Sequence, residues 1–172
     1  MNSDVAELFR KISVGVYIVG VASPEEQHAF TASWIMPVSF NPLLLALSIN
    51  PHHRSYSILK GSPQFSVSVL GEDQIDLAAH FGLSNSEKQL DPFKIENGLG
   101  GCPIFKEALA FFECRVTHDF LAGDHRLILG EVVDGRLNDP SRSPLLYQST
   151  GDLDRASAFY PKDFRTSDEE QR

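Results

Sequence analysis

Residues 29–49, AFTASWIMPVSFNPLLLALSI, carry the clearest strand signal in the chain. β-Branched and hydroxyl residues before Asn41 favour extended backbone, and Asn41-Pro42 then interrupts any regular element. The apolar run at residues 43–47 is short enough for a strand buried on both faces, although periodicity alone leaves a buried helix open. We therefore expect extended structure up to the break at Asn41-Pro42 and a buried strand after it.

Strand patterns alternate with short helical patterns along the rest of the chain. Residues 64–70 alternate apolar side chains with Ser66 and Ser68, which predicts a half-exposed strand. Further strands are expected at residues 14–22, 108–118 and 126–137, and short helices at residues 3–12, 55–60 and 72–81. A doubly wound parallel sheet would need a full helix in nearly every crossover, so the pattern favours an antiparallel barrel with helical insertions.

Length and charge limit the possible classes of protein. The chain has 172 residues, enough for one domain, which we expect over residues 1–160. The charged residues 161–172 lack periodicity and are expected to be mobile or to lie on a partner subunit. A net charge of −8 without a Lys/Arg cluster argues against binding to nucleic acid, because that binding depends on neutralising phosphates. The same charge argues against an anionic membrane surface.

The sequence also indicates the cellular compartment of the protein. The longest apolar stretches, such as residues 42–49, are far shorter than the ~20 residues of a membrane-spanning helix. The N-terminus lacks the basic start and apolar run of a secretory signal. Cys102 and Cys114 lie in no CxxC pair and are expected to be buried thiols, although counting alone leaves a disulfide open. We expect a cytoplasmic protein.

Common catalytic and metal-binding signatures are missing. The chain has no GxGxxG or GxxxxGK[ST] motif, and Gly98–Gly101 is interpreted as a loop because it follows no clear strand. His118, Asp119, Asp124 and His125 form a polar cluster near expected strand ends, but no HxH or HExxH spacing supports a metal site. A polar hairpin turn is the simpler interpretation, and a third places His125 beside a ligand at the rim of the barrel. We expect no metal.

Two segments are candidates for ligand binding. Thr31–Trp34 combine small hydroxyl side chains with the only tryptophan, and small side chains let the backbone approach a planar ligand. The alternative is an ordinary strand with a core tryptophan. His53–Tyr56 offer a cation and hydroxyls at the start of a predicted helix, where a phosphate is a natural ligand. Helix capping by Ser55 with a solvated Arg54 is the alternative there.

Several segments occur in an order that points to a known family. They are Phe30–Trp34, Val38–Pro42, Phe65–Leu70, and Gly123–His125 followed by Leu129–Val132. In this order they resemble the flavin reductase-like, FMN-binding split-barrel family, and the likeness runs from about Phe9 to about Tyr147. The resemblance implies a mainly β fold with short helices, an antiparallel Greek-key split β-barrel. It also implies a homodimer that holds flavin mononucleotide (FMN) near the subunit interface.

The resemblance further implies roles for individual residues. The residues expected to contact FMN are Thr31, Ala32, Ser33, Trp34 and Ser39 at the ring or ribityl chain, Ile49 and Asn50 through main-chain contacts, His53, Arg54, Ser55 and Tyr56 at the phosphate, and Phe81 and Gly82 beside the cofactor. His125 is the candidate catalytic residue, near the face where a nicotinamide stacks. One departure is Ala29-Phe30, since family members commonly carry glycine one or two residues before the matching threonine. Phe30 is expected either to narrow the pocket or to pack in the core.

The function implied by the resemblance is an NAD(P)H-dependent FMN reductase, including the reductase component of a monooxygenase. The flavin supplies the redox chemistry, and hydride transfer strictly requires no protein acid or base. This agrees with the lack of a conspicuous catalytic constellation. The alternative is an electron-carrier flavoprotein without NAD(P)H activity, whose acidic charge steers a basic protein partner.

Overall fold

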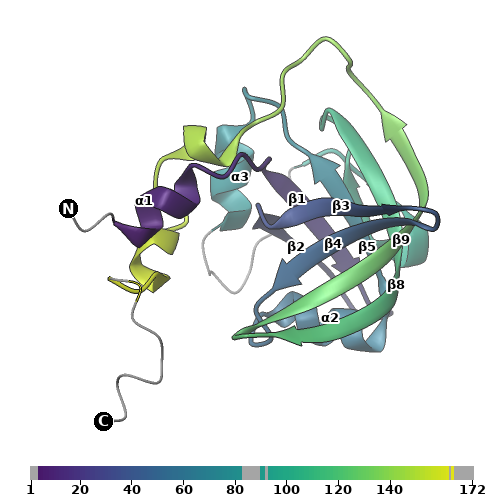
Figure 1. Ribbon diagram of the computed structural model, residues 1–172. Helices are drawn as coiled ribbons and strands as arrows, with labels where there is room; N and C mark the ends of the chain where they lie inside the picture. Colours follow the sequence, from purple (N-terminus) through teal and green to yellow (C-terminus); the bar gives the residue numbers. More distant parts are fainter. Residues whose placement is uncertain (1–3, 83–89, 92, 163, 165–172) are drawn as a thin grey trace.

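A single antiparallel sheet of seven strands dominates the computed structural model, which describes residues 4–82, 90–91, 93–162 and 164. The strands are β1 (Tyr17–Ala22), β2 (Gln27–Ala32), β3 (Ile35–Phe40), β4 (Leu43–Ile49), β5 (Gln64–Val69), β8 (Ala110–Ala122) and β9 (His125–Leu137). Their spatial order is β2-β1-β5-β8-β9-β4-β3, so β2 and β3 are the two edges. The sheet curls into a barrel that no ladder closes in the described chain (Figure 1). The mainly β split-barrel fold is confirmed.

Short helices cover the barrel without forming a layer of their own. They are α1 (Val5–Arg10), α2 (Arg54–Gly61) and α3 (Ile75–Gly82), with 3₁₀ turns η1 (Leu99–Gly101), η2 (Tyr147–Thr150) and η3 (Ala156–Phe159), and a small β6 (Ile95–Asn97) and β7 (Pro103–Phe105) pair. In Figure 1, α2 lies across the lower end of the barrel, whereas α1, α3 and the C-terminal turns gather on one flank. Contacts join α1 to η3, so the two ends of the described chain meet there.

Local capping explains where the first two helices begin. Asp4 caps α1, because its side chain accepts a hydrogen bond from the Ala6 N–H at 3.0 Å. His53 caps α2, because its Nδ1 accepts from the Ser55 N–H at 3.3 Å. The cap of α2 is thus His53, so the alternative interpretation, in which Ser55 caps the helix, was wrong.

Apolar residues form two clusters on opposite faces of β1. Val19 and Val21 face the barrel interior together with Phe65 and Leu47, whereas Ile18 packs on the outer cluster beneath α3. Burial of both faces explains why β1 has an almost continuous apolar sequence. The outer cluster therefore fixes α3 against the barrel.

The expectation of a half-exposed strand at residues 64–70 was wrong. Ser66 and Ser68 are 0% exposed, because the β7 segment covers that face of β5. Ser66 donates from its Oγ to the Pro103 carbonyl at 2.6 Å, and Ser68 accepts from the Phe105 N–H at 3.1 Å. The alternating serines of this strand therefore form hydrogen bonds with the β7 segment that covers them and do not face water.

The β8–β9 hairpin is longer than the sequence predicted. Pairing continues to Ala122 opposite His125, which leaves a turn of only Gly123 and Asp124. Gly123 has a φ of +64°, a conformation that glycine adopts without strain, and this permits so tight a turn. His125 is consequently the first residue of β9, at the tip of the hairpin.

Other expectations concern thiols, metals and the tail. Cys102 and Cys114 are free and buried, so the expectation of buried thiols is confirmed. Burial raises the pKa of Cys102 to about 11 and that of Cys114 to about 12. Within the described ranges, no group of three or more His, Cys, Asp or Glu is placed to hold a metal ion, and no helix has the length and apolar character to cross a membrane. Residues 163 and 165–172 of the expected tail lie outside the described residues.

Candidate functional site

A cavity of about 470 Å³ lies where the end of β2, the end of β4, the start of α2, the end of α3 and the tip of the β8–β9 hairpin meet. Ten of the residues predicted from the sequence line it: Thr31, Ala32, Ser33, Trp34, Ile49, Asn50, His53, Phe81, Gly82 and His125. Pockets for small ligands and cofactors usually span about 300–1,000 Å³, so this cavity has the size of a cofactor site. Residues from five separate segments thus converge on one space.

Thr31 connects two walls of the cavity. Its Oγ1 donates to the Ala78 carbonyl oxygen at 2.7 Å, which fastens α3 to the end of β2. The same bond brings Phe81 and Gly82, at the last turn of α3, to the cavity edge. Phe81 is buried in the outer cluster, where its ring packs 5.2 Å from the ring of Phe105. This wall is therefore set by core packing before any ligand binds.

His125 stands at the opposite wall. Its Nδ1 lies 2.8 Å from the Asp124 Oδ1, and the imidazole also packs against Trp34. The hydrogen bond to His125 is the main cause that lowers the pKa of Asp124. The imidazole is held on two sides, by a carboxylate and by an aromatic ring.

Of the four residues predicted to receive a phosphate, the structure brings His53 to the cavity. Arg54 instead forms an ion pair with Glu26 at 2.5 Å, on the exposed side of α2. The Ser55 hydroxyl is buried, with its Oγ 2.6 Å from the Nδ1 of His28. Tyr56 also points elsewhere, since its hydroxyl donates to Asp119 at 2.9 Å. The helix start is in place, but these three side chains are engaged elsewhere.

Two other positions complete the predicted set. Ser39 lies in β3, beside a bulge in the pairing with β4, and is absent from the described lining of the cavity. Phe30 is 6% exposed and belongs to the barrel core, with its ring 4.9 Å from that of His53. The expected packing of Phe30 in the core is confirmed, and Phe30 also contributes to the lining of the cavity.

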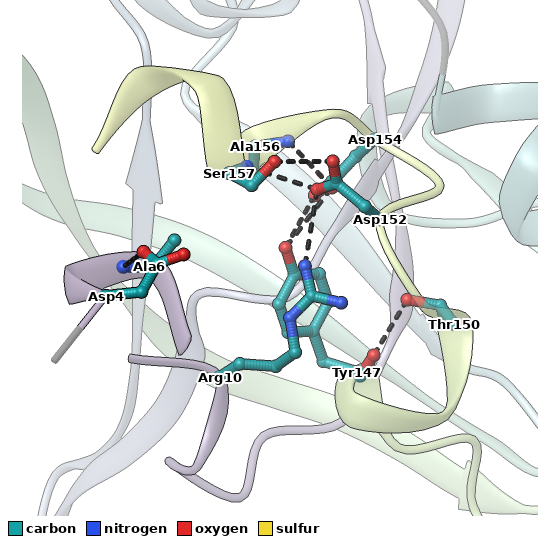
Figure 2. Close-up of polar contacts among 9 residues, drawn as sticks. All are labelled: Asp4, Ala6, Arg10, Tyr147, Thr150, Asp152, Asp154, Ala156 and Ser157. Carbon is teal, nitrogen blue, oxygen red and sulfur yellow. Dashed lines mark hydrogen bonds and ion pairs between the residues drawn. The ribbon is translucent and has the colours of Figure 1, made fainter. Parts of the chain in front are cut away.

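The C-terminal segment supplies lining residues that were not predicted. Tyr147, Asp154, Ala156, Phe159 and Tyr160 form one wall. In Figure 2, the Tyr147 hydroxyl donates to the Asp154 carboxylate, at 3.1 Å and 3.2 Å to its two oxygens. Burial, followed by the Asp154 charge, raises the pKa of Tyr147 to about 12. No periodicity or motif in residues 148–160 could have revealed this wall from the sequence.

Curated relatives cover different shares of the chain. The reductase component of 4-hydroxyphenylacetate 3-monooxygenase from Thermus thermophilus is 29% identical over 151 residues, which cover 88% of this chain and 95% of that protein. An NADH:riboflavin 5′-phosphate oxidoreductase of Streptomyces pristinaespiralis is 33% identical over 122 residues, 70% of this chain and 69% of that protein. Diflavin flavoproteins of Nostoc sp. and Synechocystis sp. match at 33% and 27% identity, and the chain spans 24% of the length of each.

Solved structures and the family match agree with these relatives. The NADH:FAD oxidoreductase SgcE6 of Streptomyces globisporus superposes with a TM-score of 0.77 at 29% identity, covering 83% of this chain and 86% of that one. A model of the flavin reductase-like domain matches residues 9–154, which include most of the chain and all of the cavity lining except Ala156, Phe159 and Tyr160. The protein belongs to the flavin reductase-like family.

Proposed function

We propose that this protein is an NADH-dependent flavin reductase that holds FMN in the 470 Å³ cavity. The observation that carries the proposal is the convergence of ten predicted cofactor and catalytic residues on that one space. The family match over residues 9–154 and the names of the relatives support the same reaction. FMN, rather than a larger flavin, is the cofactor we assign to this chain.

The lining suits a flat heterocyclic ring. Ala32, Ser33 and Gly82 are small, so backbone groups are accessible to the edge of a ligand, and Thr31 and Ser33 add hydroxyl oxygens. Trp34 is 45% exposed, although a tryptophan normally buries most of its surface, and it offers a wide apolar face at the opening. These residues are suited to hold the ring and to exclude water from it.

The start of α2 is the proposed phosphate site. The free N–H groups and the partial positive charge of a helix N-terminus favour an anion. His53 caps this eight-residue helix and lines the cavity, and Arg54 adds a cation at the same end. Because Arg54 is ion-paired with Glu26, its contribution comes from its charge near the helix start and from exchange of that partner.

The protein's main contribution to this reaction is to position the flavin and nicotinamide rings, because the flavin supplies the redox chemistry. Bound FMN would supply the acceptor for the hydride, two electrons with one proton, that leaves the nicotinamide C4 of NADH and converts NADH to NAD⁺. His125 lies at the cavity wall, and its bond to Asp124 fixes the orientation of the imidazole beside the reacting rings. Trp34 and His125 together keep the nicotinamide in a reactive geometry.

The charge of the cavity favours NADH over NADPH. Asp124 and Asp154 contribute carboxylates to the lining, and no lysine or arginine occurs among the described lining residues. A cation would normally pair with the extra phosphate of NADPH, and carboxylates repel it. The relatives named as NADH-dependent agree with this donor.

A second copy of the chain is the proposed structural partner. The edge strand β3 and the start of β4 expose a run of large apolar side chains: Met36, Val38, Phe40 and Leu43. Phe40 is 99% exposed, which is unusual for an edge strand unless another surface covers it. We propose that this edge is part of the homodimer contact, with Ser39 beside it. Dimer formation in solution, lost in Phe40→Asp, tests this assignment.

The final electron acceptor is proposed to be a monooxygenase that uses the reduced flavin. One relative is named as the reductase component of such a system and matches over 88% of this chain. We propose a cytoplasmic protein in which residues 1–160 form the catalytic domain. Electron transfer to a basic partner without NADH is the competing function.

A spectrum followed by a rate measurement tests the proposal. The purified protein, saturated with FMN, is expected to be yellow and to oxidise NADH at a rate proportional to protein concentration. Tight retention of FMN with no oxidation of NADH or NADPH would instead support the electron carrier. A protein that fails to bind FMN would contradict both functions.

A further inference from the structure

The segment of residues 147–160, here called the C-terminal strap, forms one wall of the cavity. Its first residue is fixed to the barrel by a hydrogen bond from the Tyr147 N–H to the Val14 carbonyl oxygen at 2.9 Å. Its far end supplies Ala156, Phe159 and Tyr160 to the cavity lining. The family match ends at residue 154, within this segment.

The strap is held in place by polar contacts with α1 and within itself. Arg10 of α1 forms an ion pair with Asp152 at 3.3 Å, and Asp152 also accepts from the Ser157 hydroxyl at 2.5 Å (Figure 2). Asp154 accepts from the N–H of Ala156, the first residue of η3, at 3.1 Å. The Phe9 and Tyr160 rings pack 5.0 Å apart. The strap is therefore a fixed wall and not a loose end.

Phe159 is the exceptional residue of this wall. Its side chain lines the cavity and is nevertheless 87% exposed, although phenylalanine is among the residues most often buried. Tyr160 packs on Phe9 and the Ala156 N–H donates to Asp154, so the backbone on both sides of Phe159 is anchored and Phe159 has little chain entropy left to lose on binding a ligand. It presents an aromatic face next to the proposed flavin site.

The size of the cavity indicates what that face contacts. A volume of about 470 Å³ accommodates a mononucleotide-sized ligand and the nicotinamide end of a donor, but not the whole dinucleotide in addition. When the nicotinamide reaches the flavin, the diphosphate leads the adenine ring back to the mouth. Adenine stacks well on an aromatic side chain.

We propose that Phe159 is the stacking platform for the adenine ring of NADH. This inference rests on the proposed reductase function. In this role Phe159 contributes to the affinity for NADH and does not contribute to the binding of FMN. Asp154, in the same wall, keeps the platform region negative and so favours an adenosine without a 2′-phosphate.

Phe159→Ala is the test variant, and three ligands separate the possible roles. Loss of stacking is expected to raise the KM for NADH about tenfold with little change in kcat. Reduced nicotinamide mononucleotide, which lacks adenine, is expected to have the same KM with wild type and variant. ADP-ribose, which has adenine but cannot react, is expected to bind the variant about tenfold more weakly by calorimetry.

Two controls isolate the effect. Leu137→Ala removes a similarly exposed apolar side chain from the distant end of β9 and is expected to leave all three values unchanged. Phe159→Trp keeps an aromatic face and is expected to restore wild-type ADP-ribose binding. Equal ADP-ribose affinity in wild type and Phe159→Ala would overturn the inference, as would an equal increase in KM for both donors. Failure of the wild type to oxidise NADH would instead refute the reductase function.

Discussion

The imidazole of His125 and the indole of Trp34 lie with their ring centroids 5.2 Å apart and their planes inclined by 49°. Trp34 belongs to the connection between the edge strands β2 and β3, and His125 to the tip of the β8–β9 hairpin. Their contact joins two segments that no sheet ladder connects directly. The nicotinamide site we propose is therefore defined by the packing of the hairpin tip on the β2–β3 connection.

His125→Ala is expected to slow hydride transfer about tenfold while FMN affinity stays nearly unchanged. The loss is smaller than that of a general acid or base, because the reaction needs orientation at this position rather than proton transfer. Single-turnover reduction of bound FMN by NADH measures the rate, and a fluorescence titration measures FMN affinity.

His118→Ala is the matched control for His125. His118 lies in the same hairpin, where its ring stacks 5.4 Å from Phe120, and it is absent from the described cavity lining. Its replacement is expected to leave the reduction rate unchanged. A large loss of FMN binding in His125→Ala would mean that the imidazole belongs to the cofactor site.

Arg54→Ala is expected to weaken FMN about tenfold and riboflavin hardly at all, because a cation at the start of α2 contributes through the phosphate. Lys60→Ala, at the other end of the same helix, removes equal charge and should affect neither ligand. Parallel titrations with FMN and riboflavin measure the difference. Equal losses for both ligands would exclude Arg54 from phosphate binding.

Gly130→Ala is expected to destabilise the barrel by about 1–3 kcal/mol. An added Cβ would lie 2.5 Å from the Phe65 ring and 2.9 Å from the Cys114 Cβ, where the core has no space. Gly61→Ala is the control, since nothing lies within 4 Å of a Cβ at the end of α2. Urea denaturation of the two variants compares their free energies of unfolding. Equal free energies of unfolding for the two variants would show that the barrel interior has space for a methyl group at Gly130.

The two buried thiols make the free energy of unfolding depend on pH in the alkaline range. Burial raises the pKa of Cys102 to about 11 and of Cys114 to about 12, from an ordinary value of 9.0. As the pH rises through 9, the unfolded chain loses these protons and the folded chain keeps them, so the free energy of unfolding falls. In the double variant Cys102→Ala/Cys114→Ala, the free energy of unfolding should depend less steeply on pH between about 8 and 11. In this range the thiols of the unfolded chain lose their protons before those of the folded chain.

Reactivity provides a second measurement on the same thiols. Buried thiols with raised pKa values are poor nucleophiles. DTNB is therefore expected to modify the folded protein very slowly at neutral pH and both thiols rapidly after unfolding. Fast modification of the folded state would contradict the burial of Cys102 and Cys114.

Sequence patterns were sufficient where a residue's neighbours determine its structure. The apolar run ending at Ile49, the break at Asn41-Pro42 and the order of the flavin-family segments predicted the strands and ten cavity residues. These patterns were insufficient where tertiary contacts determine the exposure or the partner of a side chain. Ser66 looked solvent-facing because nothing local reveals that β7 covers it. The engagement of Arg54 with Glu26 likewise depends on how α2 packs beside β2.

The C-terminal strap illustrates the same limit at the site. Asp152 and Asp154 look like ordinary charged loop residues in the sequence, but they hold η3 and Arg10 in place. Their function depends on the position of α1, which the chain reaches more than a hundred residues earlier. Phe159 acquires its place at the cavity mouth only through this fold.

Reduction of the bound flavin by NADH can be observed by mixing the FMN-loaded protein with one equivalent of NADH in the absence of oxygen. For an NADH-dependent flavin reductase, the flavin absorbance is expected to bleach while an equal amount of NADH is oxidised, and NADPH is expected to react more slowly. Unchanged absorbance of both chromophores with either nucleotide would contradict this function.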